Sequence, residues 1–281
     1  MTVVLTHNSY GKSSVRLTKV TRLPDRHELA QWTIDIELEG DFAESYTAGD
    51  NRNVVATDTM KNIVYVLARD QDLADPESFS LALGRHFLAD YPQVAKCRVE
   101  VRVEPWRRIL VDSSPHPHAF VSDEGGRRTC TVTVTRAERS LAAGVDALAL
   151  LKTTDSAFRG FHHDAFTTLP EVDDRLFATL LKADWTYNLA ASNWNRHYTQ
   201  IRQTLLQTFA KHKSLSAQHT LHAMGAAVLE TCPEVDEISL AMPNRHQLLV
   251  NLEPFGRDNP NCVFVATDEP FGLIEGTLRR G

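Results

Sequence analysis

Polar side chains that could bind or activate a small molecule are spread along this chain of 281 residues instead of forming one compact motif. They gather where predicted strands and helices begin or end, which is where a folded scaffold presents side chains to a ligand. The segments concerned are Tyr10–Lys12, Val54–Asn62, Phe158–Leu169, Asp174–Phe177 and Met242–His246.

Each of these segments also has a purely structural explanation. Thr57 or Asp58 could cap the helix that follows, and the Pro243-Asn244 pair is typical of a turn. Arg175 could form a surface ion pair with a neighbouring aspartate, which contributes little to stability. Composition and spacing alone therefore leave these residues without an assigned role.

Motifs for the common cofactor, metal and nucleophile sites do not occur in the sequence. Gly125-Gly126 is followed by two arginines instead of the Lys-Ser/Thr of a phosphate-binding loop, and there is no G-x-S-x-G motif. The His116-Pro117-His118 and His162-His163 segments lack the spacing of two metal ligands on one helix. We expect the first to form a turn beside its prolines, and we expect no metal site.

Composition excludes several other classes of protein. The net charge of −6 argues against binding to duplex nucleic acid, and 42% hydrophobic residues argue against disorder. The longest apolar stretch, Leu141–Leu151, contains Asp146 and is too short to cross a bilayer, and the N-terminus does not resemble a signal peptide. Free thiols in a reducing cytosol are expected for the widely spaced cysteines, Cys97, Cys130, Cys232 and Cys262.

Three segments, residues 33–38, 98–104 and 129–135, alternate between apolar and polar side chains. Strands of this kind have one apolar and one polar face, which favours an antiparallel sheet. The polar face carries threonine, arginine and glutamate. It could face bulk water or line a wide polar channel.

Apolar residues recur at helical spacing in two pairs of segments. In the first pair, a stripe from Met60 to Leu67 precedes a second helix that begins at Asp75-Pro76, an N-cap followed by proline at the first helical position. In the second pair, a stripe from Ile201 to Phe209 precedes another from Ala217 to Val228, which Ser216 could cap.

Both halves of the chain thus follow the order strand, strand, helix, helix, strand, strand. The strands of the second half are predicted near residues 144–152, 175–187, 236–242 and 246–253. The predicted fold class is α+β, with two units at residues 1–138 and 139–281, each an antiparallel sheet with its helices on one face.

Taken together and in order, the polar segments resemble the urate oxidase (uricase) family of cofactor-independent enzymes. The resemblance extends from residue 10 to residue 274, and it is specific because many short motifs keep a family-like order and spacing. The matching segments are Tyr10-Gly11-Lys12, Ala56-Thr57-Asp58-Thr59-Met60-Lys61-Asn62, Pro115-His116-Pro117-His118-Ala119-Phe120, Thr167-Thr168-Leu169, Asp174-Arg175, Asp184-Trp185-Thr186-Tyr187, Ser216-Ala217-Gln218, Pro243-Asn244-Arg245-His246 and Pro270-Phe271-Gly272-Leu273-Ile274.

This resemblance implies two tandem tunnelling-fold (ββααββ) units per chain. It implies a homotetramer in the form of a hollow barrel, with active sites at subunit interfaces and the polar sheet faces lining the tunnel. The implied reaction is the oxidation of urate by O2 and water to 5-hydroxyisourate and hydrogen peroxide in purine degradation, without a metal or organic cofactor. The chain ends at Leu278–Gly281 without a peroxisomal Ser-Lys-Leu signal, so a cytoplasmic location is expected.

The resemblance assigns substrate-binding roles one residue at a time. Arg175 would clamp the anionic purine with its planar fork of donors, and Gln218 would offer a donor and an acceptor to the ring edge. Phe158 would stack on the ring face, and Leu169 would wall the pocket. Ala217 stands where the family usually has valine and would contribute a backbone contact.

A second group of residues is assigned to the substrate edge and to the handling of O2 and protons. Thr57 would place its hydroxyl over the urate plane, with Lys12 as its partner, and His246 would complete a proton relay. Asn244 would hold the O2 or water site, and Asp58 would offer a backbone N–H to the purine edge.

Two other functions stay open at this point. A metal-dependent purine- or pterin-processing enzyme would need a converging His/Cys triad, and a non-catalytic purine-binding or shell-forming protein would lack Lys12, Thr57 or His246. The resemblance gives no role to three residues near Phe158, for which we expect solvent exposure: Arg159, His162 and His163.

Overall fold

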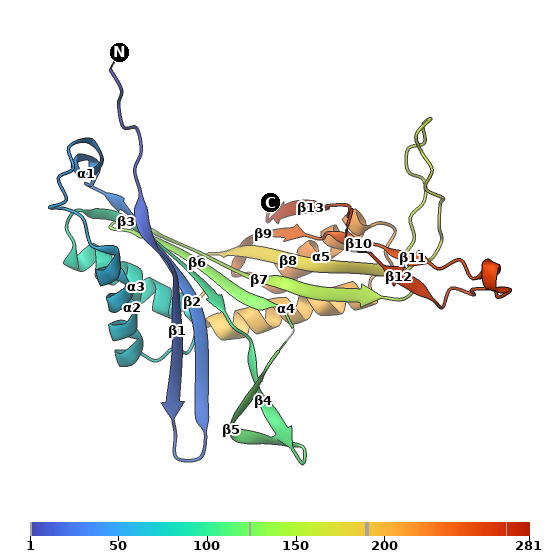
Figure 1. Ribbon diagram of the computed structural model, residues 1–281, viewed down its shortest axis with the longest axis horizontal. Helices are drawn as coiled ribbons and strands as arrows, with labels where there is room; N and C mark the ends of the chain where they lie inside the picture. Colours follow the sequence, from blue (N-terminus) through green and yellow to red (C-terminus); the bar gives the residue numbers. More distant parts are fainter. Residues whose placement is uncertain (1, 124, 189–190, 268) are drawn as a thin grey trace. The chain divides into compact units, whose positions relative to one another are not determined.

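The computed structural model describes residues 2–123, 125–188, 191–267 and 269–281 (Figure 1). The chain divides into two units, each with its own internal contacts. The first unit contains Met1–Gly144 and Thr186–Asn195, and the second contains Val145–Trp185 and Arg196–Gly281.

The first unit is built on four antiparallel strands, and their apolar side chains alternate as the sequence predicts. In spatial order these are β1 (Tyr10–Arg22), β2 (His27–Gly40), β3 (Val94–Val103) and β6 (Arg127–Thr135). Ile34, Val99 and Val132 point into the core and are fully buried. The opposite face carries ion pairs across the strands, such as Lys96–Glu39 at 2.8 Å.

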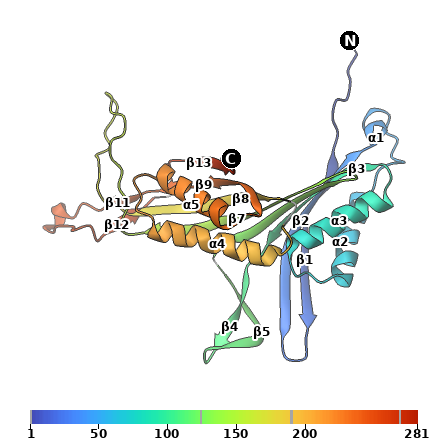
Figure 2. The same cartoon turned by 180° about the vertical axis from the view of Figure 1, so that it is seen from behind.

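Helices cover the apolar face of this sheet. Besides the short α1 (Ala43–Thr47), they are α2 (Thr57–Asp70), which packs on β1, and α3 (Pro76–Asp90), which packs on β3 and β6 (Figures 1 and 2). The predicted cap of α3 is confirmed, because the side chain of Asp75 accepts a hydrogen bond from the Ser78 N–H at 2.7 Å. Met60 and Phe87 bury fully in this interface, which confirms the apolar stripes.

A separate hairpin extends from the first unit, formed by β4 (Trp106–Val111) and β5 (Ser114–Ser122). The turn expected beside these prolines lies just before them, at Asp112-Ser113, while Pro115 and Pro117 themselves lie in β5. Proline cannot donate to a sheet, but an edge strand of a two-stranded ribbon tolerates it.

The main strands of the second unit follow the order β7, β8, β9 and β13. Their bounds, with the two helices of this half, are β7 (Arg139–Lys152), β8 (Phe177–Tyr187), α4 (Trp194–Lys211), α5 (Ala217–Thr231), β9 (Val235–Ala241) and β13 (Glu275–Arg279). Three predicted strands are thus confirmed, and both apolar stripes are buried along α4 and α5. Helix α5 packs on β9 and β13 (Figure 2), where a Cβ on Gly225 would come within 2.8 Å of the Leu278 side chain.

The fourth predicted strand of the second half, at 246–253, is wrong. Its residues form the short β11 (Gln247–Leu249), which pairs with β12 (Phe264–Ala266) in a ribbon of its own, and the 3₁₀ turn η1 (Glu253–Phe255). The strand that pairs with β9 is β13, whose alternation is only five residues long and gave no clear signal. Within the described part of the chain, no helix is both long enough and apolar enough to span a membrane.

Candidate active site

The ten predicted site residues fall into two groups. Lys12, Thr57 and Asp58 lie in the first unit. The second unit contains the others, which are Phe158, Leu169, Arg175, Ala217, Gln218, Asn244 and His246.

In the first unit, Thr57 and Asp58 are the first two residues of α2. The expectation that one of them caps the helix is wrong, because the N-cap is Ala56, which has no side chain able to cap. The first intrahelical bond runs from the Met60 N–H to the Ala56 carbonyl at 3.1 Å. The preceding N–H groups therefore point out of the helix end, where its dipole favours an anion.

The Asp58 side chain is turned toward its own helix. It accepts hydrogen bonds from Lys61 at 2.5 Å and from Asn62 at 3.1 Å. The bond from Lys61 is the main cause that lowers the pKa of the Asp58 carboxyl, and the charge of Lys12 lowers it further. Lys12 is thus close enough to the start of α2 for its charge to act there.

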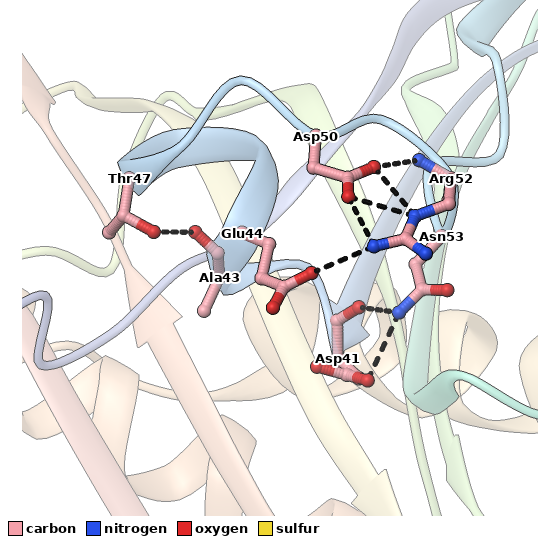
Figure 3. Close-up of polar contacts among 7 residues, drawn as sticks. All are labelled: Asp41, Ala43, Glu44, Thr47, Asp50, Arg52 and Asn53. Atoms are coloured by element: carbon pink, nitrogen blue, oxygen red, sulfur yellow. Dashed lines mark hydrogen bonds and ion pairs between the residues drawn. The ribbon is translucent and has the colours of Figure 1, made fainter.

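The loop before α2 is fixed by polar contacts (Figure 3). The Asn53 amide donates to the carbonyl and the carboxylate of Asp41 at 3.1 and 3.0 Å, and Arg52 pairs with Asp50 at 2.5 Å and with Glu44 at 3.8 Å. These contacts hold the segment that leads to Thr57.

Tyr10 joins this loop to the strand that carries Lys12. Its hydroxyl accepts from the Val55 N–H at 2.7 Å and donates to the Val55 carbonyl at 3.1 Å, and burial raises the pKa of Tyr10. Lys12 lies near the start of β1, which begins at Tyr10. The sequence identified the Tyr10–Lys12 segment without assigning a role to Tyr10.

In the second unit, the guanidinium carbon of Arg175 lies 5.0 Å from the centre of the Phe158 ring. Partial burial lowers the pKa of Arg175, and its buried Nε atom has no hydrogen-bond partner within the described part of the chain. The alternative of a surface ion pair is wrong, because Asp173 pairs with Arg159 at 2.6 Å and Asp174 accepts from the Thr154 hydroxyl at 2.7 Å. Arg175 thus has free donors for an anion.

Phe158 begins a stack of three rings. Phe161 stacks on it at 4.8 Å between centroids, and His163 stacks on Phe161 at 4.6 Å. Phe158 also pairs through its backbone with Val172, which closes the intervening loop. The expected exposure of Arg159, His162 and His163 is confirmed, and Leu169 on the same loop is 54% exposed.

The start of α5 is tied to the segment that carries Phe158 and Arg175. Ser156 pairs with Ser214 in an isolated bridge, and the Ser156 carbonyl accepts from the Arg175 N–H at 2.8 Å. Two residues after Ser214, the side chain of Ser216 caps α5 by accepting from the His219 N–H at 3.1 Å, as predicted. Neither Ser156 nor Ser214 carried a sequence signal.

Ala217 and Gln218 occupy the same helical positions in α5 as Thr57 and Asp58 occupy in α2. The Ala217 side chain is buried and Gln218 is exposed. The first intrahelical bond of α5 runs from the Thr220 N–H to the Ser216 carbonyl, so the N–H groups of Ala217 and Gln218 also point out of the helix end.

Asn244 belongs to the short strand β10 (Asn244–Arg245), which pairs with β8, so the turn expected there is wrong. Its N–H donates to the Gly272 carbonyl at 2.7 Å. His246 follows β10, and its carbonyl accepts from the Thr267 N–H at 3.0 Å. Among the residues that the structure describes, neither the Asn244 amide nor the His246 imidazole has a hydrogen-bond partner, so both are available to a ligand.

The described residues contain no group of three or more His, Cys, Asp or Glu side chains that could hold a metal ion. The rings of His116 and His118 lie 4.5 Å apart on β5. Two imidazoles on an exposed hairpin supply only two of the ligands that a protein metal site needs.

The fold defines a class, an α+β protein in which each unit combines antiparallel strands with helices. Comparison with known proteins gives the family. The uricase family model matches residues 8–133 and 141–275, and the chain belongs to the uricase family, which confirms the resemblance seen in the sequence.

Individual relatives agree with this assignment. The uricase of Arthrobacter globiformis is 46% identical over 278 residues, covering 99% of this chain and 90% of the relative. The uricase of Dictyostelium discoideum is 38% identical, covering 98% and 97%. The crystal structure of the Arthrobacter globiformis uricase matches with a TM-score of 0.95 at 45% identity and covers 100% of this chain and 96% of that one.

Proposed function

We propose that this chain oxidises urate with O2 and water to 5-hydroxyisourate and hydrogen peroxide. The observation that carries the proposal is the half-buried guanidinium of Arg175, which lies beside the Phe158 ring. Its Nε atom has no hydrogen-bond partner among the residues that the structure describes. A planar cation of this kind can bind a planar anion through two parallel hydrogen bonds, while the aromatic ring contacts the purine face.

The other binding residues surround the purine edge in this proposal. The outward N–H groups at the start of α2 and α5, from Asp58 and Ala217, donate to urate oxygens or ring nitrogens, which the helix dipoles favour. The Gln218 amide pairs with an edge that has both a donor and an acceptor, and Leu169 covers the pocket.

Catalysis is assigned to Lys12, Thr57 and His246. Lys12 and Thr57 remove a proton from the urate monoanion, His246 takes part in the relay, and Asn244 holds O2 or water. The deprotonated purine gives two electrons to O2, which takes up two protons and becomes hydrogen peroxide, and water supplies the hydroxyl group of the product. The proposal includes no metal or organic cofactor, since the purine is itself the reductant.

The same proposal includes the tandem tunnelling-fold units at residues 1–138 and 139–281 and their assembly into a hollow homotetramer. The order of the main elements supports it, because β1, β2, α2, α3, β3 and β6 in the first half correspond to β7, β8, α4, α5, β9 and β13 in the second. Active sites at subunit interfaces would combine Lys12 and Thr57 of one chain with Arg175 of another. A cytoplasmic location is consistent with four free thiols.

The test of the reaction uses chelator-treated protein and urate, with urate absorbance and O2 uptake followed together. We expect one O2 consumed per urate, and about half of that O2 returned when catalase is added, because two molecules of hydrogen peroxide yield one O2. If urate binds while neither signal changes, the chain is a purine-binding protein and the proposal fails.

The shared site has its own test, in which chains with Lys12→Met are mixed with chains with Arg175→Ala after dissociation. Each variant alone is expected to be nearly inactive. Reassembled mixtures should regain activity if the two groups meet across chains, because some interfaces then contain both native residues. Absence of recovery in mixed tetramers would place both groups in one chain and overturn this part of the proposal.

A further inference from the structure

Between Lys12 and Val15, β1 contains one residue more than the stretch of β2 that pairs with it. Lys12 lies opposite Ile36 on β2, and Val15 lies opposite Ile34. Three steps along β1 therefore match two steps along β2, which is a β-bulge at Ser13 and Ser14.

The bulge decides which face of the sheet Lys12 occupies. Residues directly opposite in an antiparallel pair point to the same face, and Ile36 and Ile34 are both buried beneath the helices. Lys12 is therefore on the helix-bearing side, as is Val15. In a regular strand two residues three apart point to opposite faces, so Lys12 would lie on the polar face without the bulge, away from α2 and Thr57.

The Asp35 carboxylate stabilises the extra residue. Ser14 has a positive φ of 58°, a conformation that residues other than glycine adopt only when their surroundings require it. The carboxylate of Asp35 stabilises this conformation, because one of its oxygens accepts a hydrogen bond from the Ser14 N–H at 2.5 Å. Its other oxygen pairs with Arg102 at 2.7 Å. Arg102 fixes the carboxylate, and the carboxylate fixes the bulge.

The residue before Lys12 adds a second constraint on the register. A Cβ on Gly11 would lie 1.8 Å from the Ile36 carbonyl oxygen, so β1 passes too close to β2 for any other residue at that position. A slipped register would bring Tyr10 or Lys12 to this place and require the strands to move apart.

We infer that Asp35 is a positioning residue for the reaction, which aims Lys12 at the start of α2 by stabilising the Ser13-Ser14 bulge. This inference rests on the proposed function, because it assumes that Lys12 takes part in proton transfer. Asp35 itself is on the opposite face from Lys12, so it acts through Lys12 and not by touching the substrate.

The test compares Asp35→Ala with Asp35→Asn and with the control Glu39→Ala. Glu39 is on the same strand and the same face and also forms an ion pair, but its partner is Lys96, at 2.8 Å, and not the Ser13-Ser14 bulge. We expect Asp35→Ala to lower kcat by about tenfold to 100-fold with KM for urate nearly unchanged, because misplacing a catalytic group costs rate and not substrate affinity. Asp35→Asn keeps an oxygen acceptor and should retain most of the rate, as should Glu39→Ala.

A pair of substitutions at Ser14 tests the same point if Asp35→Ala does not fold. Ser14→Gly suits a positive φ and should keep or raise kcat, whereas Ser14→Ala disfavours it and should lower kcat. The inference is overturned if kcat is the same in both Ser14 variants, or if folded Asp35→Ala matches Glu39→Ala. Lys12→Met separates the two proposals: if it turns over urate normally, the role of Lys12 fails, whereas an inactive Lys12→Met with a fully active Asp35→Ala removes only the positioning role.

Discussion

The Arg175 guanidinium lies over the Phe158 ring, with 5.0 Å between the guanidinium carbon and the ring centre. The backbone holds both residues in place, because the Arg175 N–H donates to the Ser156 carbonyl and the Phe158 N–H donates to the Val172 carbonyl. We predict that Arg175→Lys, which keeps the charge but loses the planar fork, raises KM for urate by about tenfold to 100-fold, as expected for the loss of a charge-assisted hydrogen bond.

Arg159→Lys is the matched control for this prediction. Arg159 is the neighbour of Phe158 in sequence, but its side chain is more than half exposed and is engaged with Glu171 and Asp173. Steady-state kinetics and equilibrium binding of a non-reactive purine should show no change in this control. Equal affinities in both variants would refute the clamp role of Arg175.

Two helix caps of the same kind allow a second prediction. Ser216→Ala and Asp75→Ala each remove a side chain that accepts from the backbone N–H three residues later, and each should lower the free energy of unfolding by about 1 kcal/mol. Only Ser216 precedes the predicted urate-binding residues Ala217 and Gln218. Thermal unfolding should therefore show similar losses, while KM for urate rises only in Ser216→Ala; a rise in both would indicate a general loss of stability.

Much of the fold could be predicted because the signals are local. Alternation at residues 98–104 and the Asp75-Pro76 pair each depend on neighbouring residues, and both predictions are confirmed. The bulge at Ser14 depends on Asp35, which is 21 residues away, and the contact between β9 and β13 joins segments separated by more than thirty residues. Such long-range contacts leave no periodic pattern in the sequence.

At the candidate site, too, features that depend on neighbouring residues could be predicted, and features that depend on distant residues could not. Ser216 was recognised as a helix cap from its local pattern, but the tie between Ser156 and Ser214 comes from the tertiary structure. Arg175 looked like a surface residue in the sequence because Asp173 and Asp174 precede it. In the structure those carboxylates are bonded to Arg159 and Thr154 instead, through contacts between residues distant in the sequence.

A pair of histidines near the start of α5 gives a prediction about pH. His212 and His219 lie 3.2 Å apart between ring nitrogens, and the pKa of His212 is lowered first by burial, then by His219 and by Lys152. A histidine whose pKa is lower in the folded state favours folding when neutral, so this contribution is present above the unfolded value of about 6.5 and is lost as the pH falls through the folded value. When the pH is lowered beyond about 6.5, we expect Tm to decrease, and we expect a smaller decrease in His212→Gln.

His162→Gln is the control for this titration, because His162 is exposed. Its Tm profile should follow that of the unmodified chain. If His212→Gln shows the same acid sensitivity as the unmodified chain, other groups cause the loss of stability.

The Tyr10 hydroxyl links β1 to the loop that leads into α2, and Tyr10→Phe tests this link. The substitution leaves the buried Val55 N–H without an acceptor, which should lower the free energy of unfolding by about 1–3 kcal/mol. It should also lower kcat, because Val55 precedes Thr57 by two residues and Tyr10 precedes Lys12 by two.

Tyr65→Phe is the control, since the Tyr65 hydroxyl makes a longer bond, 3.4 Å, to the Arg16 carbonyl at an exposed position. Denaturant unfolding and urate turnover measured on both variants decide the matter: a stability loss in Tyr10→Phe with unchanged kcat would show that Lys12 and Thr57 are held in place without this bond.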